Sequence, residues 1–134
     1  MDLHTSPVGW SVIGASIEVH RRLGPGLLES AYEQALATEL RARAVPFEQQ
    51  VRVPASYKGT LLRRTYRVDF VIAGELVVEI KHSGQLVANH RAQLRTYMRL
   101  LNVRQGLLLN FGYPRLIDGL TSLLLPEREE ASRP

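Results

Sequence analysis

The stretch Tyr66-Arg-Val-Asp-Phe-Val-Ile-Ala-Gly-Glu-Leu-Val-Val-Glu-Ile-Lys81 decides the fold of this chain. Two runs rich in β-branched and aromatic residues cover it, Tyr66 to Ile72 and Leu76 to His82, of which the second ends one residue beyond the stretch, and Ala73-Gly74 separates them. Such runs are typical of strands, and a short break with glycine predicts a turn between them. The sequence therefore predicts two neighbouring strands here.

Three charged residues stand inside these apolar runs. Asp69 is surrounded by Val68 and Phe70, where burial of a carboxylate costs free energy unless a cation pairs with it. In the second run, alternation places Glu79 and Lys81 on one face. If the strands pair, Asp69 and Glu79 become neighbours, with Lys81 beside them.

Two carboxylates and a backbone carbonyl, which we assign to Ile80, form an oxygen-rich set suited to Mg²⁺ or Mn²⁺. Hydrolysis of a phosphodiester needs such a metal and a fixed cation to stabilise charge on the phosphoryl oxygens. Asp69, Glu79 and Lys81 supply both. The spacing alone supports equally well a buried ion pair between Asp69 and Lys81 without catalysis.

The remaining periodicity predicts an α/β architecture. Ser6 and Pro7 are typical of a helix start, and Gly24-Pro25-Gly26 ends that helix. Apolar spacing and turn residues predict the following further elements: a helix over about 27–44, a three-strand meander over 47–81 with breaks at Lys58-Gly59 and Ala73-Gly74, a helix over 87–102, a buried strand over 107–111, and a strand or short helix over 115–125.

Composition narrows the class of protein. The 134 residues carry a formal charge of +4 and a pI near 9.8, which favours contact with a polyanion. With no cysteine, catalysis by a thiol and disulfide bonds are excluded. No run reaches the roughly 20 apolar residues that span a bilayer, so we expect a cytoplasmic protein without a membrane partner. We expect one domain over 1–126 and a disordered tail over 127–134.

The order of several motifs resembles a known family. The chain is similar to the GxxExxY proteins, a branch of the PD-(D/E)xK nuclease superfamily, from about Ile13 to Gly112. The motifs that carry this resemblance are Leu23-Gly-Pro-Gly-Leu-Leu-Glu29-Ser-Ala-Tyr32, Tyr66-Arg-Val-Asp69, Val78-Glu-Ile-Lys81, then His90, Gln93 and Tyr97, and finally Gly106-Leu-Leu-Leu-Asn-Phe-Gly112.

The resemblance implies a restriction-endonuclease-like core, a mixed sheet of four to five strands flanked by helices. It implies that Asp69 and Glu79 are metal ligands and that Lys81 is the catalytic lysine. It also implies that Glu29 completes the acidic site, as in RecB-like and phage-exonuclease-like relatives. Gln93 and Tyr97 fit the QxxxY motif that lies near the substrate in those relatives.

Several polar residues stand on or beside the apolar faces of the predicted helices. Glu29 falls inside the apolar arc of its helix, which is unusual for a carboxylate without a metal or a partner. Glu39 has Arg43 one turn later and is expected to form a solvated ion pair. On the third helix, the polar residues His90, Gln93 and Tyr97 line one edge of the apolar face, where they could reach a phosphate or serve only packing. A separate stripe on that helix consists of Arg91, Arg95 and Arg99.

The first hypothesis is a Mg²⁺- or Mn²⁺-dependent nuclease that acts on DNA. The rival hypothesis is a non-catalytic nucleic-acid-binding or regulatory module that keeps the fold and the metal site for stability. A third hypothesis is a homodimer formed through the apolar N-terminal helix.

Overall fold

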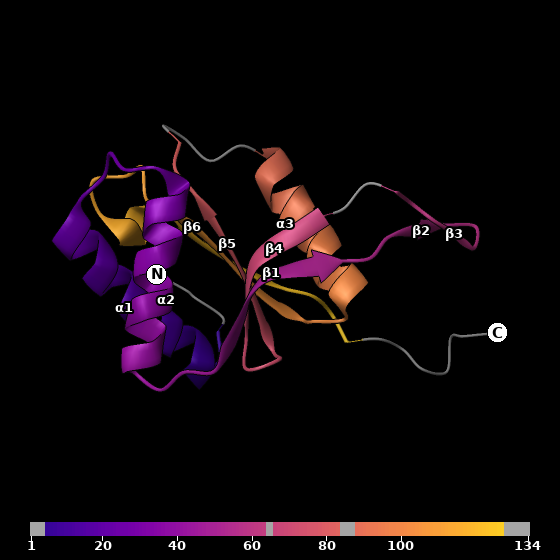
Figure 1. Ribbon diagram of the computed structural model, residues 1–134, viewed down its shortest axis with the longest axis horizontal. Helices are drawn as coiled ribbons and strands as arrows, with labels where there is room; N and C mark the ends of the chain where they lie inside the picture. Colours follow the sequence, from indigo (N-terminus) through magenta and orange to yellow (C-terminus); the bar gives the residue numbers. More distant parts are fainter. Residues whose placement is uncertain (1–4, 64–65, 84–87, 128–134) are drawn as a thin grey trace.

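The computed structural model describes residues 5–63, 66–83 and 88–127. Three helices cover a five-stranded mixed sheet, and a two-stranded ribbon projects from its far end (Figure 1). The elements in chain order are α1 (Pro7–Leu23), α2 (Glu29–Ala42), β1 (Phe47–Val53), β2 (Ser56–Tyr57), β3 (Thr60–Leu61), β4 (Tyr66–Ile72), β5 (Leu76–Lys81), α3 (Ala88–Leu101), β6 (Gln105–Asn110), the 3-10 helix η1 (Leu116–Gly119) and β7 (Leu120–Leu124). The expected mixed sheet flanked by helices is confirmed.

The predicted helix boundaries follow from capping chemistry. The Ser6 hydroxyl accepts the Gly9 N–H at 3.2 Å, and Pro7 occupies the first turn of α1. The helix ends where Gly24, at φ +70°, donates its N–H to the His20 carbonyl at 2.7 Å. The expected ion pair between Glu39 and Arg43 is present on α2 at 2.9 Å.

The sheet has the strand order β1-β4-β5-β6-β7. β5 and β6 run parallel and are joined through α3, whereas the other neighbours are antiparallel. In the predicted meander, Lys58-Gly59 was expected to separate the first two long strands. The structure differs, because Pro54 ends β1 and the turn at Lys58-Gly59 joins the short strands β2 and β3 instead. The ambiguous segment 115–125 contains both η1 and β7.

Helices cover both faces of the sheet with separate cores (Figure 1). One core packs α1 and α2 against Phe70, Ile72, Val78 and Ile80, and the other packs α3 against Val68, Val71, Val77 and Leu108. Glu79 on β5 is only 6% exposed between these layers. The sheet therefore holds Glu79 in largely apolar surroundings.

The neighbouring strands β1 and β4 change faces at one point. Val68 and Phe70 are two residues apart and would ordinarily share a face, yet they belong to opposite cores. On β1 the same change separates Phe47 from Val51. The break falls at Gln50, which has the left-handed φ of +50° and lies in register with Asp69, where no ladder pair forms. The sheet is thus locally interrupted beside Asp69.

The loop between α1 and α2 is held by one buried tyrosine. The Tyr32 hydroxyl donates to the Gly24 carbonyl and accepts the Leu27 N–H at 3.1 Å. Its ring, which is fully buried, stacks on Phe111 with a centroid separation of 4.4 Å. Tyr32 therefore fixes the start of α2, on which Glu29 lies.

No helix among the described residues has both the length and the apolar character that crossing a membrane requires. Residues 128–134 of the predicted tail lie outside the described part of the chain. The assignment of residues 1–126 to a single domain stays a prediction.

We predict that Tyr32→Phe lowers the free energy of unfolding by about 1–3 kcal/mol, because the Leu27 N–H and the Gly24 carbonyl lose their buried partner. Urea unfolding measures this change. Tyr57→Phe is the matched control, since Tyr57 is 63% exposed on β2 and its variant is expected to stay within about 0.5 kcal/mol of the wild type. Equal stabilities of the two variants would contradict the assigned role of Tyr32.

Candidate metal and phosphodiester site

Asp69 and Glu79 lie side by side where the ladder between β4 and β5 ends. The last ladder pair there is Phe70 with Val78. Beyond it, the Asp69 N–H donates to Oε1 of Glu79 at 2.8 Å, and the Ile80 N–H donates to Oδ2 of Asp69 at 2.7 Å. One oxygen of each carboxylate thus replaces a missing sheet hydrogen bond. The other oxygens, Oδ1 and Oε2, remain for further contacts.

Burial makes this pair of carboxylates costly to ionise. Loss of solvation raises the pKa of Glu79 to about 8, and the neighbouring charge of Asp69 adds to the shift. Loss of solvation likewise raises the pKa of Asp69 to about 6, and the charge of Glu33 contributes. The hydrogen bonds from the backbone and the charge of Lys81 oppose both shifts without cancelling them. The pair would therefore gain from a nearby cation.

Lys81 lies beside Glu79, as the alternation of β5 predicted. Its Nζ is 3.9 Å from Oε2 of Glu79, and its side chain is 21% exposed. The alternative that the sequence allows, an ion pair between Asp69 and Lys81, is not among the ion pairs of the described residues. Lys81 pairs with Glu79 instead. The distance between Nζ and Oε2 is long for an ion pair. Because the Lys81 side chain is also partly exposed, its ammonium group lies close to the acidic pair and remains accessible to solvent.

Two residues that the sequence did not single out join this site. Gln50 donates from Nε2 to Oε1 and Oε2 of Glu33 on α2, at 2.9 and 3.0 Å, and to Oδ1 of Asp69 at 3.2 Å. Glu33 also accepts from Gln49 at 3.0 Å. One amide thus connects carboxylates of a helix and a strand that would otherwise repel each other. The only sequence signal for Glu33 is its position one turn after Glu29.

Glu29 approaches the site from the end of β5. Its Oε2 accepts the His82 N–H at 3.1 Å, and its charge raises the pKa of Glu79, although less than burial and Asp69 do. The His82 ring stacks on Tyr32 at 5.9 Å and accepts the Gly26 N–H at 3.1 Å. Glu29 therefore lies within electrostatic reach of Glu79 while it fixes the segment after Lys81.

The residues expected to contact substrate lie on α3. Tyr97 packs against Tyr66 with ring centroids 6.1 Å apart, and burial together with the charge of Glu79 raises its pKa. Gln93 is exposed, and both residues line a pocket of about 370 Å³ with Leu62 and Tyr66. His90 is half-buried, and its Nδ1 has no hydrogen-bond partner among the described residues. The pocket therefore adjoins the acidic pair through Tyr97.

The chemistry of the acidic pair fits a hard divalent cation. Carboxylate oxygens are the ligands that Mg²⁺ and Mn²⁺ prefer, and the raised pKa values of Asp69 and Glu79 indicate a deficit of positive charge. Across residues 5–63, 66–83 and 88–127, no three His, Asp or Glu side chains converge closely enough to hold a metal by themselves. A cation here would need additional ligands, such as a backbone carbonyl or water.

Comparisons with known proteins identify the superfamily and support the fold. Residues 7–120 match the family model described as the PD-(D/E)XK nuclease superfamily. Among solved structures, the crystal structure of SSO0001 is similar, with a TM-score of 0.54 and 20% sequence identity, and the match covers 98% of this chain and 72% of that chain. At this identity the likeness concerns the fold. A search of curated proteins gives no significant match.

We predict that the metal-free protein becomes less stable as the pH rises from about 4 to about 8. Both carboxyls have a higher pKa in the folded state than in the unfolded chain, so the folded state binds more protons in this window. The loss of unfolding free energy is on the order of a few kcal/mol. Urea unfolding at several pH values with a chelator present measures it.

Glu79→Gln tests the cause of that pH dependence. The amide oxygen of glutamine can still accept the Asp69 N–H, but the buried charge is gone. We expect a flatter pH profile and a more stable protein at pH 8. Asp118→Asn, at an exposed ion pair, is the control and should leave the slope unchanged. A profile for Glu79→Gln as steep as that of the wild type would rule out this explanation.

A second prediction concerns the backbone at Gln50. Because its φ is +50°, Gln50→Gly is expected to be more stable than Gln50→Ala by about 1 kcal/mol, since alanine is strained in the left-handed region. At Gln49, a neighbour on β1 without a positive φ, the order should reverse. Thermal and urea unfolding of the four variants test this, and the same order at both positions would contradict the left-handed assignment.

Proposed function

Since the chain belongs to the PD-(D/E)XK nuclease superfamily, we propose that it is a Mg²⁺- or Mn²⁺-dependent nuclease that hydrolyses phosphodiester bonds of DNA. Membership of the superfamily itself suggests a metal-dependent nuclease, and nucleases of this superfamily generally use divalent metal ions. The observation that carries the finer proposal is the buried pair Asp69 and Glu79 with the ammonium group of Lys81 next to it.

Within this proposal, the metal ligands are Asp69, Glu79, the carbonyl of Ile80 and, at the periphery, Glu29. When held by these residues, a divalent cation would supply polarisation of the phosphate and activation of water. The backbone N–H groups of Asp69 and Ile80 hold the two carboxylates in place, so their other oxygens, Oδ1 and Oε2, need little reorganisation. This arrangement supports a metal-binding role more directly than a purely structural one.

Lys81 supplies the fixed positive charge. Its Nζ lies 3.9 Å from Glu79, and its partial exposure allows contact with a phosphate that approaches from solvent. A lysine in this position stabilises negative charge that builds on phosphoryl oxygens during hydrolysis. We propose that Lys81 has this role and is more than the partner of Glu79 in an ion pair.

We further propose that the chain is a GxxExxY protein on the RecB-like side of the superfamily. Support comes from the motif residues Glu29 and Tyr32, which meet the segment after Lys81 through His82. Gln93 and Tyr97 of the QxxxY pattern line one pocket near the acidic pair, and with His90 they would position the nucleic-acid strand.

The experiment is a cleavage assay on end-labelled single- and double-stranded DNA and RNA, with Mg²⁺, Mn²⁺ or a chelator. We expect metal-dependent cleavage of DNA, and a loss of about 10²-fold or more in Asp69→Asn and Lys81→Ala. Asp118→Asn is the matched carboxylate control, because Asp118 of η1 forms an exposed ion pair with Arg115, outside the candidate site. Thermal unfolding of every variant verifies that it is folded.

The same samples separate the proposal from its rival, a nucleic-acid-binding module without catalysis. A wild type that binds DNA but cuts nothing, or variants that cut as fast as the wild type, would favour that rival. Thermal unfolding with Mg²⁺ adds a readout independent of turnover. We expect the metal to raise the melting temperature of the wild type at pH 8 and not that of Asp69→Asn.

A further inference from the structure

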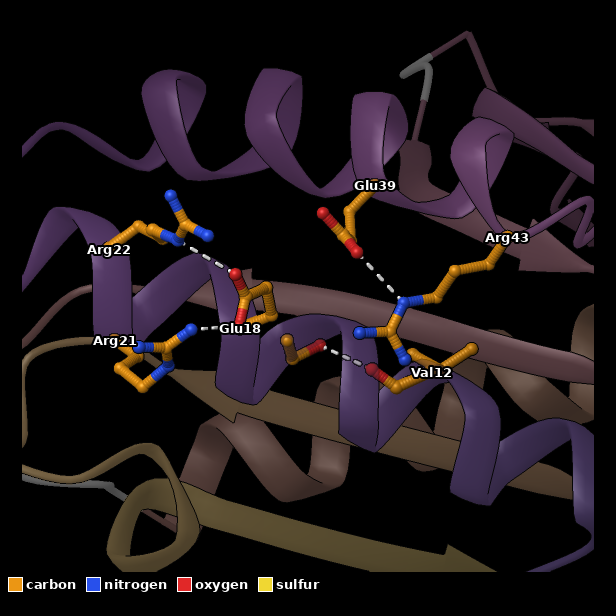
Figure 2. A network of polar contacts seen from close by, with 7 residues as sticks. Val12, Glu18, Arg21, Arg22, Glu39 and Arg43 are labelled. Atoms are coloured by element: carbon orange, nitrogen blue, oxygen red, sulfur yellow. Dashed lines mark hydrogen bonds and ion pairs between the residues drawn. The ribbon is translucent and has the colours of Figure 1, made fainter.

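The arginines of this protein fall into two groups with different electrostatic surroundings. Several of them pair with a nearby carboxylate, as Figure 2 shows for Arg21 and Arg22, which share Glu18, and for Arg43 with Glu39. The arginines of β1, β4, α3 and the segment before β4 form no ion pair with a described carboxylate; they are Arg52, Arg63, Arg67, Arg91, Arg95 and Arg99. Arg41 of α2, whose guanidinium group lies over the Phe47 ring, also forms no ion pair with a described carboxylate. Most of the arginines without an ion pair therefore lie on the part of the fold that extends beyond the acidic pair.

Arg52 and Arg67 are the most informative of these residues. They are register partners across β1 and β4, and both are exposed. Like charges directly opposite each other destabilise a sheet. Neither guanidinium group forms a hydrogen bond or an ion pair with any residue in the described ranges. The two guanidinium groups extend from directly opposed positions and have no counterion among the described residues. An external anion can therefore bind between them.

The position of this arginine pair relates it to the candidate site. Arg52 follows Gln50 by two residues, and Arg67 precedes Asp69 by two. Two residues of strand span about 7 Å. The arginine pair therefore lies two residues along β1 and β4 from Gln50 and Asp69.

The direction of the side chains follows from their neighbours. Val51 and Val53 of β1, and Val68 of β4, point into the core beneath α3. By alternation, Arg52 and Arg67 point to the opposite face of the sheet. That is the face from which Gln50 reaches Glu33 of α2. The pair is therefore on the α2 side, near Gln50, which contacts Asp69, whereas alternation places Glu79 and Lys81 with Val77 on the side of α3.

We propose that Arg52 and Arg67 form a phosphate clamp that binds the backbone of a nucleic-acid strand beside the phosphate engaged at Asp69 and Glu79. This inference rests on the proposed function and deepens it. Guanidinium groups bind phosphate oxygens in a bidentate manner. Contacts with the backbone position a strand without reading its bases. The clamp therefore gives affinity and register along the strand, and no preference for sequence.

The test measures binding rather than cleavage. Fluorescence anisotropy follows labelled duplex DNA, single-stranded DNA and RNA binding to the full chain, with a chelator present and KCl varied. Loss of two phosphate contacts in Arg52→Gln/Arg67→Gln should reduce the slope of log K against log salt by about 1.8 on duplex DNA and about 1.4 on a single strand. The affinity should fall by a similar factor for unrelated sequences.

The matched control is Arg21→Gln/Arg22→Gln, which removes the same charge from α1, where both arginines pair with Glu18. It should keep the wild-type slope. Unfolding in urea provides a second readout: the Arg52→Gln/Arg67→Gln protein should be at least as stable as the wild type, because a repulsive pair is removed. A protein destabilised by these changes, or one with the wild-type salt slope, would overturn the clamp.

Failure of the clamp and failure of the nuclease proposal are distinguishable. If the wild type cuts DNA and the double variant binds with an unchanged slope, the clamp is wrong and the nuclease stands. If the wild type cuts nothing and the double variant loses the predicted slope, the clamp stands without the nuclease. A wild type that binds no nucleic acid overturns the clamp.

Discussion

The site depends on one interruption of the sheet, the change of faces at Gln50 and Asp69. In a regular ladder, the N–H groups of Asp69 and Ile80 would be satisfied by backbone carbonyls. Here the Glu79 and Asp69 carboxylates accept them, at 2.8 and 2.7 Å. Because a buried N–H needs a partner, the fold itself requires the two carboxylates to be where they are. The acidic pair is therefore part of the sheet and not an addition to its surface.

This arrangement has an electrostatic cost that the surroundings reduce only partly. Burial and mutual repulsion raise the pKa of Asp69 and of Glu79. Gln50 and Lys81 bring donors or positive charge near the pair, but one amide and one ammonium group do not balance two buried carboxylates and the nearby Glu33. A site built this way favours cations in its centre and, through the unpaired arginines of β1 and β4, anions at its margin. A metal ion has the positive charge that the centre favours, and the phosphates of a nucleic-acid strand have the negative charge that the margin favours.

Much of the fold could be predicted from the sequence, because its signals are local. Ser6 with Pro7 marks the start of α1, and alternation in β5 places Glu79 beside Lys81. Glu33 and Gln50 could not be found in this way. The left-handed backbone of Gln50 and its contact with α2 arise only when distant segments pack, and no propensity of glutamine predicts that conformation. The turn at Lys58-Gly59 was recognised, but which strands it joins depended on Pro54.

The left-handed residue has a further consequence for how the molecule behaves among its own copies. β1 is an outer strand of the sheet, and an outer strand presents unpaired N–H and C=O groups to which another chain can add. Gln50 interrupts that row in the middle of β1, so an incoming strand cannot keep its pairing along the whole edge. The distortion that supports the acidic pair thus also protects the protein against edge-to-edge aggregation.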